Sequence, residues 1–286
     1  MLTGLATTIA GHGSNSGAPT RLPRVSTWTA SAPTDPVPAL FEPKFYLLLQ
    51  GAKRLVIGGK TLDFTAGRCA VSSVGLPFTS QVIEASPATP YIGVELRLDA
   101  GLVAGLVLDM PADPDAEEPT FCHMQATEVV MDPLGRLLGL LNDPADVPVL
   151  APQFERELCY RLLQGPMGGT LRQIVQRSTR FDQIRTAVEW ICDNADKPMC
   201  VKRLASSVGM SMTSFHRHFK AVTAHSPLAY QRHIRLLDAR RKIASGSISI
   251  TAIAFTTGYA SASQFSREYR RMFGVPPSRH TLQVQR

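Results

Sequence analysis

The feature that most constrains this chain is a sequence pattern that occurs twice, about 50 residues apart. The first copy is "VKRLASSVGMSMTSFHRHFKAV", residues 201–222, and the second is "ITAIAFTTGYASASQFSREYRRMF", residues 250–273. In each copy a short helical run ends at a glycine, and a serine that can cap a second helix follows. A short helix, a tight turn and a second helix make a helix-turn-helix, so the sequence predicts two such units.

The second helix of each copy is expected to have a buried face and a polar face. Aromatic residues at helical spacing predict the buried face, Phe215 and Phe219 in the first copy and Phe265 and Tyr269 in the second. The opposite face carries Thr213, His216, Arg217 and Lys220 in the first copy, and Ser263, Ser266, Arg267 and Arg270 at the same spacing in the second. A repeated core alone indicates only a duplicated fold, but repeated hydroxyl, imidazole and guanidinium groups are typical of surfaces that contact base edges. Lys220 and Arg270, nearer the helix ends, are expected at phosphates.

Charge is distributed unevenly along the chain. Residues 178–286 contain 17 Lys and Arg against 6 Asp and Glu, a net +11, whereas residues 1–177 carry a net −4. Such asymmetry predicts a domain that meets a polyanion, joined to one that does not, although a solvated basic surface also explains it. The helix that joins the two copies is expected to add phosphate contacts. Its basic residues are Arg232, Arg235, Arg240 and Arg241, of which the last two have simple solvation as the alternative.

The N-terminal half has a different pattern. Residues 1–38 are rich in small and polar residues without periodicity, which predicts a disordered tail. Residues 39–128 contain short runs of alternating apolar residues, such as those at positions 92 to 98, which predict an antiparallel β-sandwich or barrel. In residues 129–177 leucines recur at helical spacing, and they are expected either in the chain's own core or between two subunits. Four of them are Leu134, Leu137, Leu138 and Leu141.

The C-terminal region, residues 181–279, resembles the DNA-binding domain of the AraC/XylS family of bacterial transcription regulators. The motifs that carry the resemblance are "LASSVGMS", "SFHRHFK", "SPLAYQRHIRL", "RLLDARRKI", "AIAFTTGY" and "SQFSREYRRMFGVPPSR". The resemblance implies two helix-turn-helix units joined by one long helix, which present two recognition helices to successive major-groove segments. The base-facing positions that it implies are Thr213, His216 and Arg217 in the first helix, and Ala262, Ser263, Ser266 and Arg267 in the second.

Residues 39–174 resemble, less specifically, the cupin-like N-terminal domain of one subgroup of AraC-type regulators. The matching stretches include "FYLLLQGAKRLVIGGK" and "ERELCYRLLQGPMGGTLRQI". The resemblance implies a domain that binds a small effector, dimerises, or does both. The expected fold class is therefore α+β, a cupin-like antiparallel barrel with flanking helices followed by an all-α domain. Its expected segments are an effector domain at 39–128, a dimerisation or coupling segment at 129–177, and a DNA-binding domain at 178–286 with units at about 201–223 and 250–273.

Two classes of function remain open. The first is a sequence-specific, effector-controlled transcription regulator, with operator DNA, RNA polymerase for an activator, and a second copy of the chain as partners. The alternative is a cupin-class enzyme tethered to DNA, but the first 177 residues contain only His12 and His123, so we expect no metal, cofactor or catalytic site. Cys122, beside His123, is either a reactive thiol or a buried structural cysteine. No apolar stretch approaches the roughly 20 residues of a membrane span, and a cytoplasmic location is expected.

Overall fold

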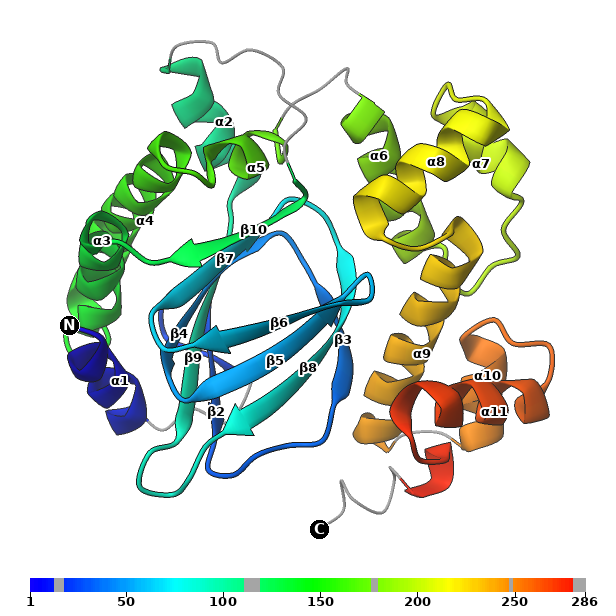
Figure 1. Ribbon diagram of the computed structural model, residues 1–286, viewed down its shortest axis with the longest axis horizontal. Helices are drawn as coiled ribbons and strands as arrows, with labels where there is room; N and C mark the ends of the chain where they lie inside the picture. Colours follow the sequence, from blue (N-terminus) through cyan, green and yellow to red (C-terminus); the bar gives the residue numbers. More distant parts are fainter. Residues whose placement is uncertain (13–17, 111–118, 176–179, 247–248, 280–286) are drawn as a thin grey trace. The chain divides into compact units, whose positions relative to one another are not determined.

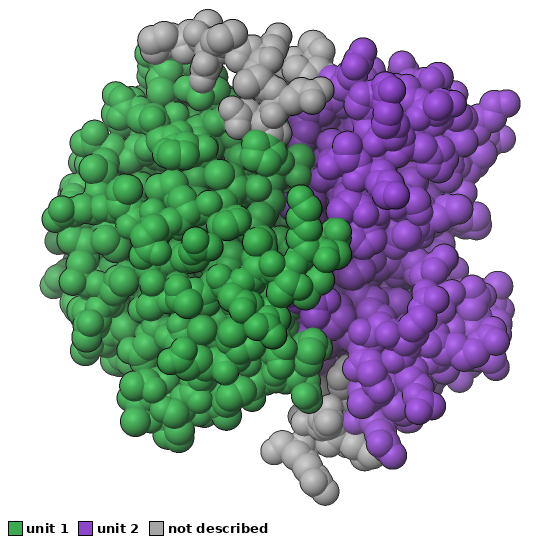
Figure 2. Space-filling view, viewed as in Figure 1, with its two compact units in different colours: residues 1–36, 41–75, 80–177 green, residues 37–40, 76–79, 178–286 purple. Residues whose placement is uncertain are grey.

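The computed structural model describes residues 1–12, 18–110, 119–175, 180–246 and 249–279. The chain divides into two compact units, shown in Figure 2. Unit 1 comprises residues 1–36, 41–75 and 80–177, and unit 2 comprises residues 178–286 together with 37–40 and 76–79. The domain boundary expected at 177/178 lies within residues 176–179, outside the described residues.

Strands form two sheets, which Figure 1 shows face to face. One sheet has the order β1-β2-β9-β4-β7-β10 and the other has the order β3-β8-β5-β6. The pairs β2–β9, β4–β9, β4–β7, β7–β10 and β5–β6 are all antiparallel. The strands are β1 Ala18–Pro19, β2 Val25–Ala30, β3 Val37–Phe41, β4 Lys44–Gln50, β5 Ala52–Ile57, β6 Lys60–Thr65, β7 Arg68–Ser72, β8 Leu76–Glu84, β9 Tyr91–Arg97 and β10 Phe121–Gln125.

The central strand β4 shows how the sequence pattern divides unit 1 into layers. Its alternate residues Phe45, Leu47 and Leu49 belong to the main core, which also contains the buried residues of the helices. Those helices are α1 Leu2–Gly11, α2 Ala100–Leu108, α3 Glu128–Gly139, α4 Val147–Gln164 and α5 Gly168–Arg172, with a 3₁₀ turn at Pro144–Asp146. Tyr46, on the other side of the strand, meets the ring of Phe64 from the second sheet. Side-chain alternation therefore gives β4 one face toward the helices and one toward the barrel interior.

The expectation of a disordered tail over residues 1–38 is wrong. Residues Leu2–Gly11 form α1, in which Leu5, Ala6 and Ile9 are buried in the main core. Strand β2 pairs with β9 along its whole length. Leu5 and Ile9 lie four residues apart, so they share one face of a helix. The residues around them are mostly small, and the composition therefore indicated disorder. Residues 13–17, also in the expected tail, lie outside the described part.

The leucine stripe of residues 134–141 belongs to the core of its own unit. Leu134, Leu137 and Leu138 on α3 are fully buried, and Leu141 just after the helix is nearly so. Of the two expectations for this stripe, the structure supports the intramolecular one, because these side chains are covered by their own chain. A dimer through these leucines is therefore not consistent with the structure.

Unit 2 is helical, and in the residues that the structure describes a short helical stretch at 277–279 follows its main helices. The main helices are α6 Arg180–Asp193, α7 Val201–Ser207, α8 Met212–Thr223, α9 Pro227–Ser245, α10 Ile250–Thr256 and α11 Ala262–Phe273. The long α9 joins the pair α7–α8 to the pair α10–α11, as the resemblance implied (Figure 1). Across the described residues, no helix has both the length and the apolar character needed to cross a bilayer.

Candidate nucleic-acid interface

The turns of the two helix-turn-helix units have the same backbone geometry. Gly209 and Gly258 both have positive φ angles, +71° and +85°, which favour glycine. The residue after each glycine donates its N–H to a carbonyl five residues earlier, Met210 to Ala205 at 2.9 Å and Tyr259 to Ala254 at 3.0 Å. These positions are offset by 49 residues, but the helices that follow are offset by 50, because Ala260 lengthens the second turn by one residue. The duplication is therefore nearly exact in the backbone and not only in the sequence.

Serine caps begin both second helices. Ser211 Oγ accepts a hydrogen bond from the backbone N–H of Ser214 at 3.3 Å, and Ser261 Oγ accepts one from that of Gln264 at 3.4 Å. Both bonds satisfy backbone donors that an isolated helix terminus leaves without partners. The expected N-caps are confirmed, and they fix where α8 and α11 begin.

The predicted buried stripes are confirmed. Phe215 and Phe219 on α8, and Phe265 and Tyr269 on α11, are all fully buried. Within each helix the two ring centroids are 5.5 Å apart, at the spacing of favourable aromatic pairs. Since these rings anchor one face of each helix, the opposite face is directed away from the core of unit 2.

The residues expected to contact DNA lie on this outer side. Thr213, His216, Arg217 and Lys220 on α8 are exposed, as are Ser263, Arg267 and Arg270 on α11, whereas Ala262 and Ser266 are half-buried. In the described part of the chain, the side chains of the four cations, Arg217, Lys220, Arg267 and Arg270, make no hydrogen bond or ion pair. They are thus available to an external anion.

Four of the six acidic residues of unit 2 are engaged by other cations. Asp182 and Glu189 pair with Arg185 on α6. Asp238 on α9 pairs with Lys242 at 2.8 Å and Arg241 at 3.5 Å, and Glu268 on α11 pairs with Arg232 at 3.5 Å. Glu268 also accepts a hydrogen bond from Tyr259 Oη at 2.9 Å. Since these carboxylates are held by residues outside the candidate interface, they leave its positive charge uncompensated.

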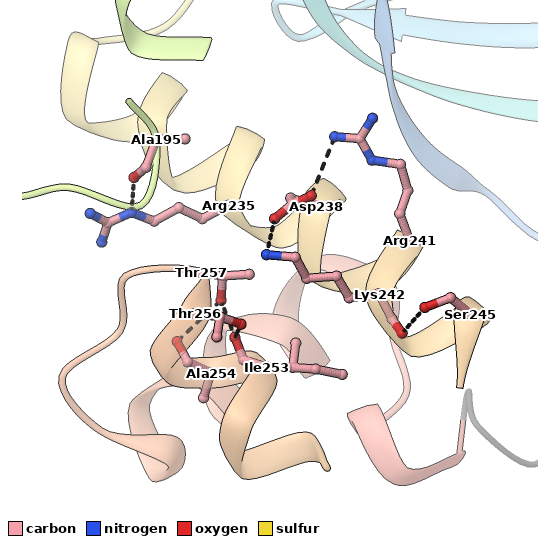
Figure 3. A network of polar contacts seen from close by, with 10 residues as sticks. All are labelled: Ala195, Arg235, Asp238, Arg241, Lys242, Ser245, Ile253, Ala254, Thr256 and Thr257. Atoms are coloured by element: carbon pink, nitrogen blue, oxygen red, sulfur yellow. Dashed lines mark hydrogen bonds and ion pairs between the residues drawn. The ribbon is translucent and has the colours of Figure 1, made fainter. Parts of the chain in front are cut away.

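One expectation for the joining helix is wrong. Arg235 on α9 is not directed to a phosphate but donates to backbone carbonyls of its own unit. It donates to Ala195 at 2.5 Å (Figure 3), and also to Gly258 at 2.7 Å and Lys197 at 3.0 Å. Burial lowers the pKa of Arg235. Its N–H groups donate to those carbonyls and are therefore not available to a phosphate. Gln231, one turn earlier, donates to Ala195 and Lys197 as well. The sequence places residues 231 and 235 on one helix face, but it does not indicate their partners almost 40 residues earlier.

A second group of charged residues, in unit 1, was missed by the sequence analysis. Lys44 Nζ lies 2.8 Å from Glu95 Oε1, and Lys53 Nζ lies 3.4 Å from the centroid of the Tyr46 ring. Lys44 and Glu95 line a cavity of about 230 Å³. The available signal was alternation, because Lys53 shares its strand face with the buried Leu55 in the run "KRLVI".

His123, considered for a metal site, and Cys122, considered as a reactive thiol, lie next to each other on strand β10. His123 packs between the rings of Phe64 and Phe121, and burial lowers its pKa. The thiol of Cys122 is 3.8 Å from the carbonyl oxygen of Pro166. No group of three or more His, Cys, Asp or Glu side chains suited to a metal ion occurs among the described residues.

Comparison with known proteins identifies both halves of the chain. A family model described as "AraC-type transcriptional regulator N-terminus" matches residues 21–170, and one described as "Helix-turn-helix domain" matches residues 204–282. The transcriptional activator RhaS of Escherichia fergusonii is 28% identical over 142 residues, 43% of this chain and 51% of RhaS. The match thus spans about half of that relative. The thermoregulatory protein LcrF of Yersinia pestis is 24% identical over 244 residues, 83% of this chain and 88% of LcrF.

Among solved structures, ToxT from Vibrio cholerae with a bound unsaturated fatty acid is similar in fold. The TM-score is 0.57 at 13% sequence identity, and the match covers 90% of this chain and 94% of ToxT. At this identity the likeness concerns the fold alone. It supports the expected α+β architecture, with a β unit followed by a helical unit.

Proposed function

The chain belongs to the AraC-type transcriptional regulators, and we propose that it binds a specific double-stranded DNA site with both helix-turn-helix units at once. The observation that carries this proposal is the pair of outer faces on α8 and α11, which present matching cations and hydroxyls without internal partners in the described chain. The alternative of a cupin-class enzyme tethered to DNA has no support in the comparisons, because both family models come from regulators or DNA-binding domains. Action at promoter DNA places the proposed site of function in the cytoplasm.

Base contacts are assigned to the middle of the two outer faces. Arg217 and Arg267 are exposed, and a guanidinium group can donate two hydrogen bonds to O6 and N7 of guanine. The surrounding short side chains contact neighbouring bases, His216 and Ser266 by hydrogen bonds and Ala262 through a thymine methyl group. Thr213 and Ser263, at equivalent positions near the helix N-termini, complete the proposed set.

Phosphate contacts are assigned to Lys220 and Arg270, three residues beyond the base-reading arginines. A cation at a phosphate positions the protein without reading sequence, and it releases a counterion. Loss of either side chain therefore weakens binding to all sequences about equally. This separates their role from that of Arg217 and Arg267.

Unit 1 is proposed to bind a small-molecule effector. Effector binding changes the fraction of molecules whose two reading helices are competent to bind the operator. ToxT, which shares the fold, has been solved with an unsaturated fatty acid and with a naphthyl-substituted butenoic acid.

The other proposed partners are a second copy of the chain, in a homodimer, and RNA polymerase if the protein is an activator. Sedimentation of the full chain with and without operator DNA tests the dimer.

Binding to DNA from upstream of the protein's own gene tests the proposal. We expect full-length protein to bind a specific segment in the presence of excess competitor DNA. Arg217→Ala and Arg267→Ala should each cost about 1–3 kcal/mol and relax base preference at one position. Arg21→Ala is the matched control, because it removes an exposed arginine from unit 1. Unchanged specificity in both recognition-helix variants would refute the assigned faces.

A further inference from the structure

Three sulfur-containing side chains lie together on one face of the edge strand β10 and its neighbour β7. Cys69 on β7 is directly opposite Met124 on β10, and Cys122 precedes Met124 by two residues. Because side chains alternate along a strand, all three point to the same face of the sheet. They pack in the main core of unit 1, whereas His123, between Cys122 and Met124, contacts the ring of Phe64 in the second sheet. We call Cys69, Cys122 and Met124 the sulfur cluster.

The strand register sets the spacing within the sulfur cluster. Cys69 and Cys122 are free thiols at diagonal positions, where Cα atoms are about 7–8 Å apart. A disulfide requires a Cα separation of less than roughly 7 Å and places its sulfurs about 2 Å apart. Two thiolates on opposite sides of a metal ion, each at about 2.3 Å, are roughly 4.5 Å apart. The diagonal spacing therefore favours an ion between the two sulfurs over a disulfide.

One thiol of the sulfur cluster is enclosed and the other is accessible. Cys69 is fully buried, whereas Cys122 and Met124 are half-buried. The Sγ atom of Cys122 lies 3.8 Å from the carbonyl oxygen of Pro166, which precedes helix α5. An ion can therefore reach the cluster from the side of Cys122 and become enclosed at Cys69.

The surroundings of Cys69 keep its thiol neutral unless an ion binds. Burial raises the pKa of Cys69 to about 12, with Cys122 acting in the same direction and backbone hydrogen bonding from Met124 in the opposite one. Without an ion the thiol therefore stays protonated at neutral pH. A coordinated metal ion deprotonates a thiol outright, and a backbone N–H that bonds to sulfur supports a thiolate ligand.

The donors of the sulfur cluster select a particular soft ion. Thiolate and thioether ligands favour Cu(I), Zn²⁺ and iron–sulfur clusters. Structural Zn²⁺ and iron–sulfur sites take four ligands, chiefly Cys and His, and no group of three or more His, Cys, Asp or Glu suited to a metal occurs in the described part of the chain. Two thiols and one thioether therefore fit Cu(I). The expectation of no metal site was based on histidine ligands and did not consider sulfur.

We propose that Cys69, Cys122 and Met124 bind one Cu(I) ion in the main core of unit 1. The ion replaces the thiol protons, which pass to the solvent, and its oxidation state does not change. The site belongs to unit 1, whereas the proposed DNA contacts belong to unit 2. The inference therefore goes beyond the proposed function and does not depend on it.

Anaerobic titration of the full-length protein with Cu(I), in competition with the coloured chelator bicinchoninate, tests this inference. We expect one equivalent of Cu(I) to bind in the presence of excess chelator. X-ray absorption at the copper edge should show two or three sulfur ligands and no nitrogen or oxygen ligand. Zn²⁺, which prefers four ligands and does not use thioethers, should bind roughly a hundredfold more weakly or less.

Substitutions within the sulfur cluster should weaken Cu(I) binding, and a substitution of another buried thiol should not. Cys69→Ala and Cys122→Ser should each lower Cu(I) affinity at least tenfold. Met124→Leu keeps an apolar side chain of similar volume and should remove one sulfur ligand from the absorption spectrum. Cys159→Ala is the matched control, because burial also raises the pKa of the Cys159 thiol to about 12, but Cys159 is on α4, where Glu155 rather than another thiol acts on it.

Three results would overturn the inference: no binding against the chelator, nitrogen or oxygen ligands at the copper, or unchanged affinity in the Cys122→Ser protein. If Cys69→Ala does not fold, the half-buried Cys122 and Met124 still decide. Loss of copper with Cys200→Ser alone would show that an exposed thiol holds the ion, and the proposed site would be wrong. Operator binding without Cu(I) binding refutes this inference alone, whereas Cu(I) binding without operator binding refutes the proposed DNA function alone.

Discussion

Arg235 Nη1 donates a hydrogen bond to the backbone carbonyl of Gly258 over 2.7 Å, and this bond joins the long helix α9 to the turn of the second helix-turn-helix unit. The same guanidinium group reaches Ala195 O, after α6, through Nε at 2.5 Å (Figure 3). One side chain therefore connects three segments that are distant in sequence. Because α9 also carries the first unit at its N-terminal end, this group helps to set the orientation of α11 relative to α8.

Removal of the Arg235 guanidinium group should therefore affect operator geometry as well as stability. We expect Arg235→Met to lose about 1–3 kcal/mol of unfolding free energy, because the part-buried carbonyls of Ala195 and Gly258 lose a charged donor. The variant should also discriminate less between the natural operator and one with a base pair inserted between the two contacted segments. Arg241→Ala is the control. The Arg241 side chain is 77% exposed and its ion pair with Asp238 is long, at 3.5 Å, so its removal should change stability little. A stability loss with unchanged spacing preference would show that Arg235 does not orient the units.

The two turn glycines should differ in their tolerance of alanine. At Gly258 a Cβ atom would lie 2.1 Å from the carbonyl oxygen of Asp196, whereas at Gly209 the nearest atom is Gln183 Nε2 at 3.4 Å. Both positions have positive φ. We expect Gly209→Ala to cost about 1 kcal/mol, from backbone strain alone, and Gly258→Ala to cost clearly more. Urea denaturation of both variants measures the difference, and equal losses would contradict the steric argument.

Local and distant constraints explain which features the sequence predicts. The stripe of Phe215 and Phe219 is predictable because helical periodicity places both rings on one face, whatever they pack against. The same holds for the cap at Ser211, which acts within three residues. The partners of Arg235 are carbonyls about 40 residues away, and the sequence does not record them.

The same distinction applies to unit 1. Strand alternation predicts a half-buried sheet, but only the closure of a second sheet over the first places Lys53 on the ring of Tyr46. A lysine in a strand is most simply interpreted as exposed. The sequence did not predict helix α1, because its apolar residues Leu5 and Ile9 are outnumbered by small residues. These two side chains are buried because α1 packs against β4 and α3, which are distant in the sequence.

Salt dependence should distinguish the phosphate-contacting cations from the base-reading ones. Operator affinity falls with salt concentration in proportion to the number of phosphates that the protein neutralises. Lys220→Gln and Arg270→Gln should each reduce the slope of log affinity against log salt by about 1, with base preference unchanged. Affinity measured from about 50 to 200 mM salt provides this slope. An unaltered slope in either variant would remove that residue from the proposed phosphate set.

The buried Lys53 should make stability depend on pH in a defined direction. Its pKa is about 7 in the folded chain and 10.5 for the ordinary side chain, so between these values the unfolded state holds one more proton. The contribution of Lys53 to stability therefore rises with pH above 7, by at most about 1.4 kcal/mol per pH unit, and its burial cost is fully present below 7. We expect Lys53→Met to be more stable than the wild type at pH 7, with a difference that narrows toward pH 9. Urea denaturation of both proteins at each pH measures the difference, in which all other titrating groups cancel to first order. A difference that stays constant across this range would mean that the ammonium group is solvated in the folded protein, and the barrel would then hold no excess buried charge.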